Sequence, residues 1–148
     1  MFLFQVFLNI CKFANFVFKF MKYYFLGIGG IGMSSLAKYL FDLGYQVMGY
    51  DKTSSYITEN LVASGIQILF DDNIELIPSD FNKKNTQVVY TPAIPKDNPQ
   101  YDYFARQGYS IKKRAVLLGE ITKNSIVFAI AGTPVSYTHL TLPTKRIV

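Results

Sequence analysis

The sequence predicts an α/β fold, a Rossmann-like doubly wound parallel sheet that occupies residues 21–122. Short apolar runs alternate with stretches in which apolar residues recur every three or four positions, as buried strands and their covering helices do. Glycines separate the two kinds of segment. A glycine-rich bend joins the first run to the first periodic stretch, which is typical of a nucleotide-binding strand–helix unit.

Three strands are expected in the first half of this region, each an apolar run bounded by turn residues. Residues 23–28 form a continuous apolar run that ends in glycines, as expected of a parallel strand buried on both faces. Shorter runs at 46–50 and 66–70 each follow a glycine that ends a helix. The intervening helices are expected at 32–43, before Gly44, and at 57–64, before Gly65.

The second half of the region continues the same alternation. A fourth strand at 86–90 ends at a Thr-Pro pair. A helix at 98–107 carries Pro99 in its first turn and has Gly108 just past its end, which is the usual placement of these two residues. The remaining elements are a short strand at 110–111, a helix at 114–123 and a strand at 126–131.

The first twenty residues differ from everything after them. They hold seven of the 13 Phe residues and contain no acid, Gly or Pro. Their polar residues would form one narrow stripe on a helix, a pattern that suits a membrane interface. Because Met21 stands directly before the first strand, we interpret residues 1–20 as a Phe-rich helix that is a non-native extension.

Composition argues against several classes of function. The net charge of +5 is concentrated in the flanks, because residues 21–133 carry eleven Lys and Arg against ten Asp and Glu. Such a near-neutral body lacks the basic surface of a nucleic-acid-binding protein. The single cysteine, Cys11, excludes an intrachain disulfide and fits a reducing cytoplasm. The single histidine, His139, lies in a Thr-rich tail and is interpreted as a solvated residue.

The bend at 27–32 predicts a site for a nucleotide diphosphate. Gly27 is expected to allow the tight turn, Gly29 to let the backbone approach a phosphate, and Gly32 to let helix and strand pack closely. The free N–H groups of the first helical turn would then face an anion. Asp51 ends the second strand, where an acid can meet a ribose hydroxyl.

The bend does not identify the nucleotide. By spacing alone the glycines and Asp51 also satisfy the NAD fingerprint, so an NAD-binding domain of an oxidoreductase stays open. A non-catalytic, membrane-tethered nucleotide-binding module, anchored through residues 1–20, is a third possibility. A tight turn that holds no ligand is the fourth.

Five segments resemble, in order and with matching spacing, the beginning of the Mur ligase family. The paired Gly29-Gly30 followed by Met33 is similar to the branch that adds L-alanine to UDP-N-acetylmuramate. It looks less like a dehydrogenase or the tripeptide-recycling branch of the family. The segments are residues 24–33, 49–52, 89–99, 113–115 and 129–133.

The resemblance implies a cytoplasmic step of peptidoglycan synthesis that uses ATP and Mg²⁺. In such enzymes the lactyl carboxylate of UDP-N-acetylmuramate is phosphorylated, and the amine of L-alanine then displaces phosphate to form an amide. NAD is not expected as a cofactor, and neither a nucleic acid nor a membrane is expected as a partner. Of the family's three domains, residues 21–122 match the UDP-sugar-binding domain, and 123–133 match the opening strand of the ATP-binding domain.

The resemblance also implies which residues bind the UDP-sugar. Asp51 and Lys52 are expected beside the uridine, and Thr91 and Ala93 in the wall of the pocket. Arg114 is expected to start a helix in a structural role. The diphosphate is expected to lie against the backbone of Gly27, Gly29, Gly30, Ile31 and Gly32.

The resemblance stops abruptly after Thr133. In the family an Ala-Gly-Thr sequence leads into His-Gly-Lys-Thr, the loop whose lysine and hydroxyl hold ATP and Mg²⁺. Here Gly132 and Thr133 are a remnant of that site, and Pro134 removes a backbone donor where one is needed. We therefore interpret residues 134–148 as a foreign tail and expect the chain as written to lack ligase activity.

Overall fold

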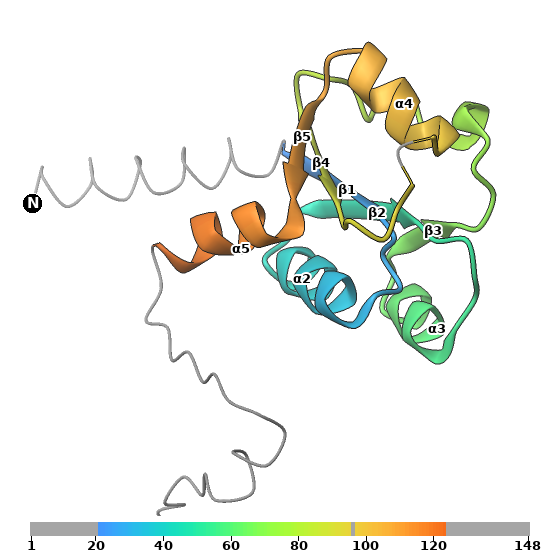
Figure 1. Cartoon of the computed structure of the whole chain (residues 1–148). Helices are drawn as coiled ribbons and strands as arrows, with labels where there is room; N and C mark the ends of the chain where they lie inside the picture. The colour runs from blue at the N-terminus through green and yellow to red at the C-terminus, as the bar shows by residue number, and fades with distance from the viewer. Residues whose placement is uncertain (1–20, 96, 124–148) are drawn as a thin grey trace, which may run out of the picture.

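The computed structural model describes residues 21–95 and 97–123, and these form a five-stranded parallel sheet (Figure 1). The strand order is β3-β2-β1-β4-β5, so the chain moves outward from β1 to one edge and then returns to build the other. This confirms the predicted doubly wound α/β fold. The strands are β1 Lys22–Leu26, β2 Gln46–Tyr50, β3 Gln67–Leu69, β4 Thr86–Tyr90 and β5 Ser110–Lys113.

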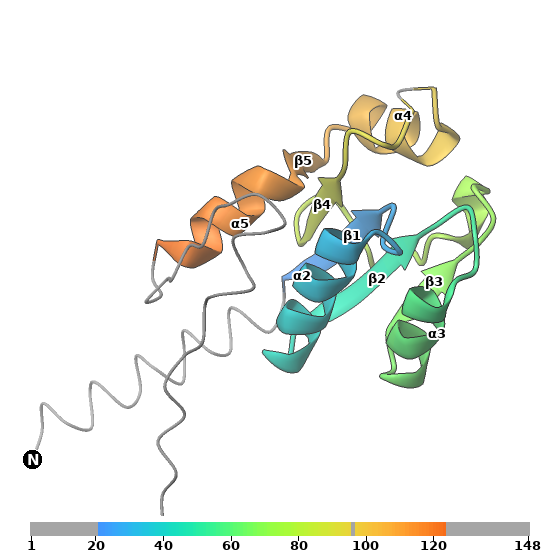
Figure 2. The same cartoon turned by 60° about the horizontal axis from the view of Figure 1, so that its bottom comes forward.

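Helices cover both faces of the sheet (Figure 2). Side chains of α2, α3 and α5 pack into one hydrophobic cluster on the first face. Side chains of α4 and of the segment around the 3-10 helix η1 pack into a second cluster on the other face. The helices are α2 Ile31–Asp42, α3 Tyr56–Ala63, η1 Ile74–Leu76, α4 Pro99–Arg106 and α5 Arg114–Thr122.

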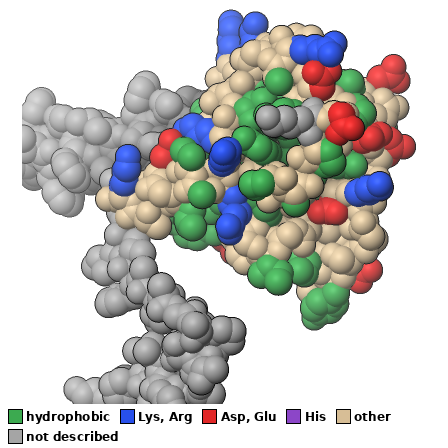
Figure 3. All heavy atoms as spheres, viewed as in Figure 1, with side chains coloured by type: hydrophobic (Ala, Val, Ile, Leu, Met, Phe, Trp, Pro, Cys, Tyr) green, Lys and Arg blue, Asp and Glu red, His purple; other side chains and the backbone are tan. Residues whose placement is uncertain are grey.

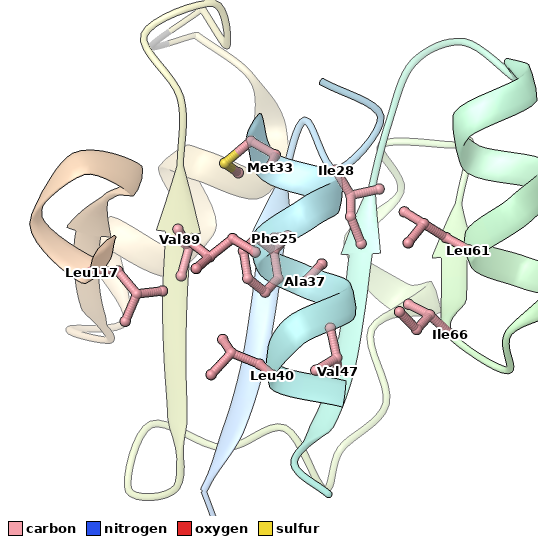
Figure 4. Close-up of a cluster of buried hydrophobic side chains, with 11 residues drawn as sticks. Phe25, Ile28, Met33, Ala37, Leu40, Val47, Leu61, Ile66, Val89 and Leu117 are labelled. Atoms are coloured by element: carbon pink, nitrogen blue, oxygen red, sulfur yellow. The ribbon is translucent and has the colours of Figure 1, made fainter. Parts of the chain in front are cut away.

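The central strand β1 is buried from Tyr24 to Leu26, and these residues are apolar on both faces of the sheet. Phe25 points toward α2 and packs in the first cluster beside Val89 of β4 (Figure 4). Tyr24 and Leu26 point the other way, into the second cluster with Phe104 of α4. Alternate residues of one strand therefore anchor two helical layers.

The glycine bend is held in place by the core beneath it. β1 ends at Leu26, two residues earlier than predicted, because Gly27 adopts a positive φ of 81° and turns the chain. Ile28 then points back into the core (Figure 4). Gly49 of β2 makes this possible, because a Cβ there would lie 2.7 Å from Ile28 Cδ1.

Capping side chains fix the start of two helices that border the same end of the sheet. The Ser55 hydroxyl accepts a bond from the Thr58 amide, and the Thr58 hydroxyl accepts one from the Ser55 amide, which closes a capping box on α3. Asn98 accepts bonds from the amides of Gln100 and Tyr101 at the start of α4. The helix η1 was not predicted from the sequence.

Several expectations fall outside the described residues. These are the Phe-rich helix at 1–20, the strand at 126–131, the ATP-site remnant Gly132 and Thr133, and the tail at 134–148. Among the helices that are described, none has the length and apolar character needed to cross a membrane.

Candidate functional site

A cavity of about 800 Å³ lies along the carboxyl ends of the strands. Its lining comes from residues that follow each of the five strands, including the glycine bend after β1 and the first residue of α5 after β5. In a doubly wound sheet this edge, where the chain reverses direction beside β1, is the usual position of a ligand. Of the predicted site residues, these line the cavity: Gly27, Gly30, Ile31, Gly32, Asp51, Lys52, Thr91 and Ala93.

The amides at the start of α2 divide into used and unused donors. The amides of Gly27 and Ile28 donate to the Tyr50 carbonyl at 2.8 and 3.1 Å, and that of Gly30 to the Gly27 carbonyl at 3.3 Å. No hydrogen bond involves the amides of Ile31 and Gly32 in the part of the chain that the structure describes. Gly30 caps α2 without a side-chain bond, so these donors face the cavity with the positive end of the helix dipole.

Among the predicted site residues that the structure describes, Gly29 is the one that does not line the cavity. Its amide donates a 2.7 Å hydrogen bond to Asp51 Oδ2, so this donor already has an anionic acceptor. A Cβ at Gly29 would lie 2.8 Å from that oxygen and 2.9 Å from Thr58 Cγ2. Gly29 is therefore required for the close approach of Asp51 and α3, whereas the sequence interpretation had assigned its small size to the approach of a phosphate.

Asp51 closes a turn as well as contacting the bend. Its second oxygen, Oδ1, accepts a 3.1 Å hydrogen bond from the Thr53 amide. Both carboxylate oxygens thus have backbone donors, and this arrangement ties the end of β2 to the start of the α2 segment. Lys52, which follows, is exposed and lines the cavity.

The expected role of Gly32 in helix–strand packing is not what the structure shows. A Cβ at Gly32 would lie 2.1 Å from Nη1 of Arg114, the first residue of α5. The absent side chain leaves room for a guanidinium at the edge of the cavity. Sequence reasoning gave Arg114 a structural role at a helix start; it starts α5 as expected, but it also lines the site.

The side of the cavity formed after β2 and β3 contains residues that sequence reasoning missed. Tyr50 and Asp72 line this side, and Asn98, which precedes α4, lines the same cavity. Burial, followed by the nearby Asp72 carboxylate, raises the pKa of the Tyr50 phenol above its ordinary value. The sequence predicts Asn98 only as the start of a helix, and nothing in its spacing indicates that it lines the same cavity as the glycine bend.

The loop after β4 forms one wall of the cavity. Thr91 and Ile94 pack against the bend, since a Cβ at Gly27 would lie 3.1 Å from Thr91 Cγ2 and 3.2 Å from Ile94 Cδ1. Ala93 lines the cavity beside them. Within residues 21–95 and 97–123 no group of three or more His, Cys, Asp or Glu side chains could hold a metal ion.

Comparison with known proteins gives one consistent family. Residues 22–125 match the family model described as "Mur ligase family, catalytic domain". The chain is 54% identical over 110 residues to the UDP-N-acetylmuramate–L-alanine ligase of Flavobacterium johnsoniae, covering 74% of this chain and 24% of that protein. It is 44% identical over 122 residues to the ligase of the same name from Porphyromonas gingivalis, covering 82% and 27%.

A solved structure agrees with these matches. The UDP-N-acetylmuramate–alanine ligase of Thermotoga maritima superposes with a TM-score of 0.63 at 30% identity, covering 70% of this chain and 23% of that one. A murein peptide ligase from Psychrobacter arcticus superposes with a TM-score of 0.58 at 25% identity, covering 68% and 20%. The chain therefore spans about a quarter of the length of the curated relatives it matches.

Proposed function

The chain belongs to the Mur ligase family, and on that premise we propose that residues 21–122 bind UDP-N-acetylmuramate for the ligase that attaches L-alanine to it. The observation that carries this proposal is the pair of unused amides, those of Ile31 and Gly32, facing a cavity of about 800 Å³. A helix N-terminus at the bottom of such a cavity is suited to a diphosphate. The names of the two curated relatives described above support the choice of sugar.

The arrangement of the residues that line the cavity supports one orientation of the ligand. The sheet order places the α2 start between the loops that follow β2 and β4. With the diphosphate at Ile31 and Gly32, the uridine lies toward the β2 and β3 side, where Lys52 and Asp72 supply polar groups. Asp51 positions the bend through Gly29 and borders the ribose.

In the complete enzyme the reaction is ATP-dependent amide formation in the cytoplasm. ATP transfers its γ-phosphoryl group to the lactyl carboxylate, and the amine of L-alanine attacks the acyl phosphate. The carbon–oxygen bond to phosphate breaks, the amine loses a proton, and the products are the amide, ADP and inorganic phosphate. Mg²⁺ neutralises the phosphate oxygens of ATP in such reactions.

The present chain is proposed to bind the sugar without completing this reaction. After Thr133 it carries Pro134, Val135 and Ser136 in place of the lysine-containing loop that grips ATP in the family. We expect no ATP turnover that depends on both UDP-N-acetylmuramate and L-alanine. Such turnover by the purified chain, measured as phosphate release, would contradict this part of the proposal.

Isothermal titration of the full chain tests the binding function. UDP-N-acetylmuramate is expected to bind, UDP to compete with it, and NADH to give no heat. The NADH arm is needed because the glycine spacing also fits a dinucleotide. Binding of NADH together with no response to UDP-N-acetylmuramate would replace the proposal by that of an oxidoreductase domain.

A further inference from the structure

The side chain of Arg114 reaches from the start of α5 to the start of α2. It follows β5 directly and is the first residue of α5. Its Nη1 atom lies 2.1 Å from the point where a side chain on Gly32 would begin, so the guanidinium covers the first turn of α2. The Ile31 and Gly32 amides, which have no acceptor among the described residues, belong to that same turn.

The charge of Arg114 is not neutralised by a neighbouring acid in the described residues. The structure gives it no ion pair there and no side-chain hydrogen bond, whereas Arg106 pairs with Asp102 at 2.9 Å. The Glu120 carboxylate, on the same helix as Arg114, is bonded by Lys112 at 2.8 Å. In Figure 3 a group of Lys and Arg side chains lies toward α5, while most Asp and Glu side chains lie on the opposite side of this face.

We propose that Arg114 is a ligand of the diphosphate, acting together with the Ile31 and Gly32 amides, and that Gly32 is a glycine because a larger residue would displace this guanidinium. The inference rests on the proposed function and adds a residue to its binding site. A diphosphate has two adjacent anionic groups, and the cavity offers two sets of donors at this point. The amides receive one phosphate, and the fork of the guanidinium receives the other in the bidentate geometry that arginine favours.

The first experiment removes the guanidinium and measures which part of the ligand then binds less tightly. The full chain and its Arg114→Gln variant are titrated with UDP, UMP and uridine. Loss of a charged bidentate contact is expected to weaken UDP binding about ten-fold or more and to leave uridine binding unchanged. Arg106→Gln is the matched control, because it removes an exposed arginine of α4 that is outside the cavity.

The second experiment moves the guanidinium without changing it. Gly32→Ala adds one methyl group in a helix, where the three nearest side-chain atoms all belong to the flexible end of Arg114, so the fold should be retained. Gly119→Ala is the matched control, because the same change on α5 meets no atom within 4 Å. We expect Gly32→Ala to weaken UDP binding and Gly119→Ala to leave it unchanged.

The double variant decides whether the two residues act together. If Gly32 acts by placing Arg114, the combined Gly32→Ala and Arg114→Gln change weakens UDP binding no more than Arg114→Gln alone. If the fold-losses in UDP affinity of the two single variants multiply in the double variant, the role assigned to Gly32 is overturned. UDP binding by Arg114→Gln that equals binding by the unaltered chain would overturn the role of Arg114, even if UDP-N-acetylmuramate binding falls. Failure of the unaltered chain to bind UDP at all would overturn the proposed function as well.

Discussion

The Asp51 carboxylate accepts a hydrogen bond from the Gly29 amide at 2.7 Å, which joins the end of β2 to the bend that follows β1. The two residues are 22 positions apart, and the bond holds the bend in the shape that leaves the next amides free. A carboxylate in this position occupies the Gly29 donor and fixes the orientation of the Ile31 and Gly32 amides. Asp51 is thus a positioning residue for the site.

Replacing Asp51 with alanine tests this role. The Gly29 and Thr53 amides would lose their acceptor, which is expected to lower the free energy of unfolding by about 1.5–3 kcal/mol. Urea denaturation measures the loss. Asp42→Ala is the control, because Asp42 is an exposed acid paired with Lys38 on α2 and such pairs contribute about 0.5 kcal/mol or less. Equal effects of the two changes would show that the bend does not depend on Asp51.

The sequence was sufficient to predict the fold and to single out most of the residues that the structure brings to the cavity, because both depend on local signals. Gly27 follows a buried apolar run and precedes a helical repeat, and a tight turn there requires a positive φ. Contacts between distant residues could not be predicted in the same way. The Gly29–Asp51 bond and the packing of Arg114 over Gly32 depend on how the strands are ordered in the sheet, which no local spacing encodes.

The loss of stability caused by a side chain at Gly27 can be separated into backbone strain and steric contact. Gly27 and Gly108 both have a positive φ, 81° and 73°, so alanine at either position costs about 1–2 kcal/mol of backbone strain. At Gly108 a Cβ meets nothing within 4 Å, whereas at Gly27 it would lie 3.1 Å from Thr91. We therefore expect Gly27→Ala to reduce the free energy of unfolding more than Gly108→Ala does, and to weaken UDP binding.

Differential scanning calorimetry measures the stability of these two variants, and UDP titrations at about 25 °C measure their binding. Equal loss of stability would indicate that Thr91 moves freely and does not form a fixed wall of the cavity. Loss of UDP binding in Gly108→Ala would indicate that the binding defect is a general effect of strain.

The capping box of α3 is expected to stabilise the protein where α3 packs against the glycine bend. Ser55 bonds the Thr58 amide, and Thr58 is fully buried with its methyl group against the space above Gly29. Ser55→Ala is expected to destabilise the protein by about 1 kcal/mol. Ser64→Ala is the control at the other end of the helix, where the hydroxyl is exposed and bonds only the Asn60 carbonyl. Urea denaturation should show a clear loss for Ser55→Ala alone.

Alkaline pH should destabilise the fold through Tyr24. Burial raises the pKa of this phenol above its ordinary value of 10.0, although its hydrogen bond to Gln100 acts in the opposite direction. A raised pKa in the folded state means that the contribution to stability is complete below pH 10, the ordinary value, and is lost as pH rises above it. The unfolded chain ionises first and is favoured increasingly, by up to about 1.4 kcal/mol per pH unit for one such group.

The Tyr24→Phe variant separates this titration from the packing of the ring. At neutral pH it should be less stable by about 1–3 kcal/mol, because Gln100 Oε1 loses its donor in a buried position. Above pH 10, where the Tyr24 phenol of the unaltered unfolded chain ionises, its stability should fall less steeply with pH. Tyr109→Phe should show the same flattening, since burial raises the pKa of Tyr109 to about 12. Urea midpoints of the three proteins, measured across this pH range, test the prediction. If stability falls with pH equally in all three, neither phenol ionises more easily in the unfolded chain than in the folded one. The loss of stability at alkaline pH would then come from other groups.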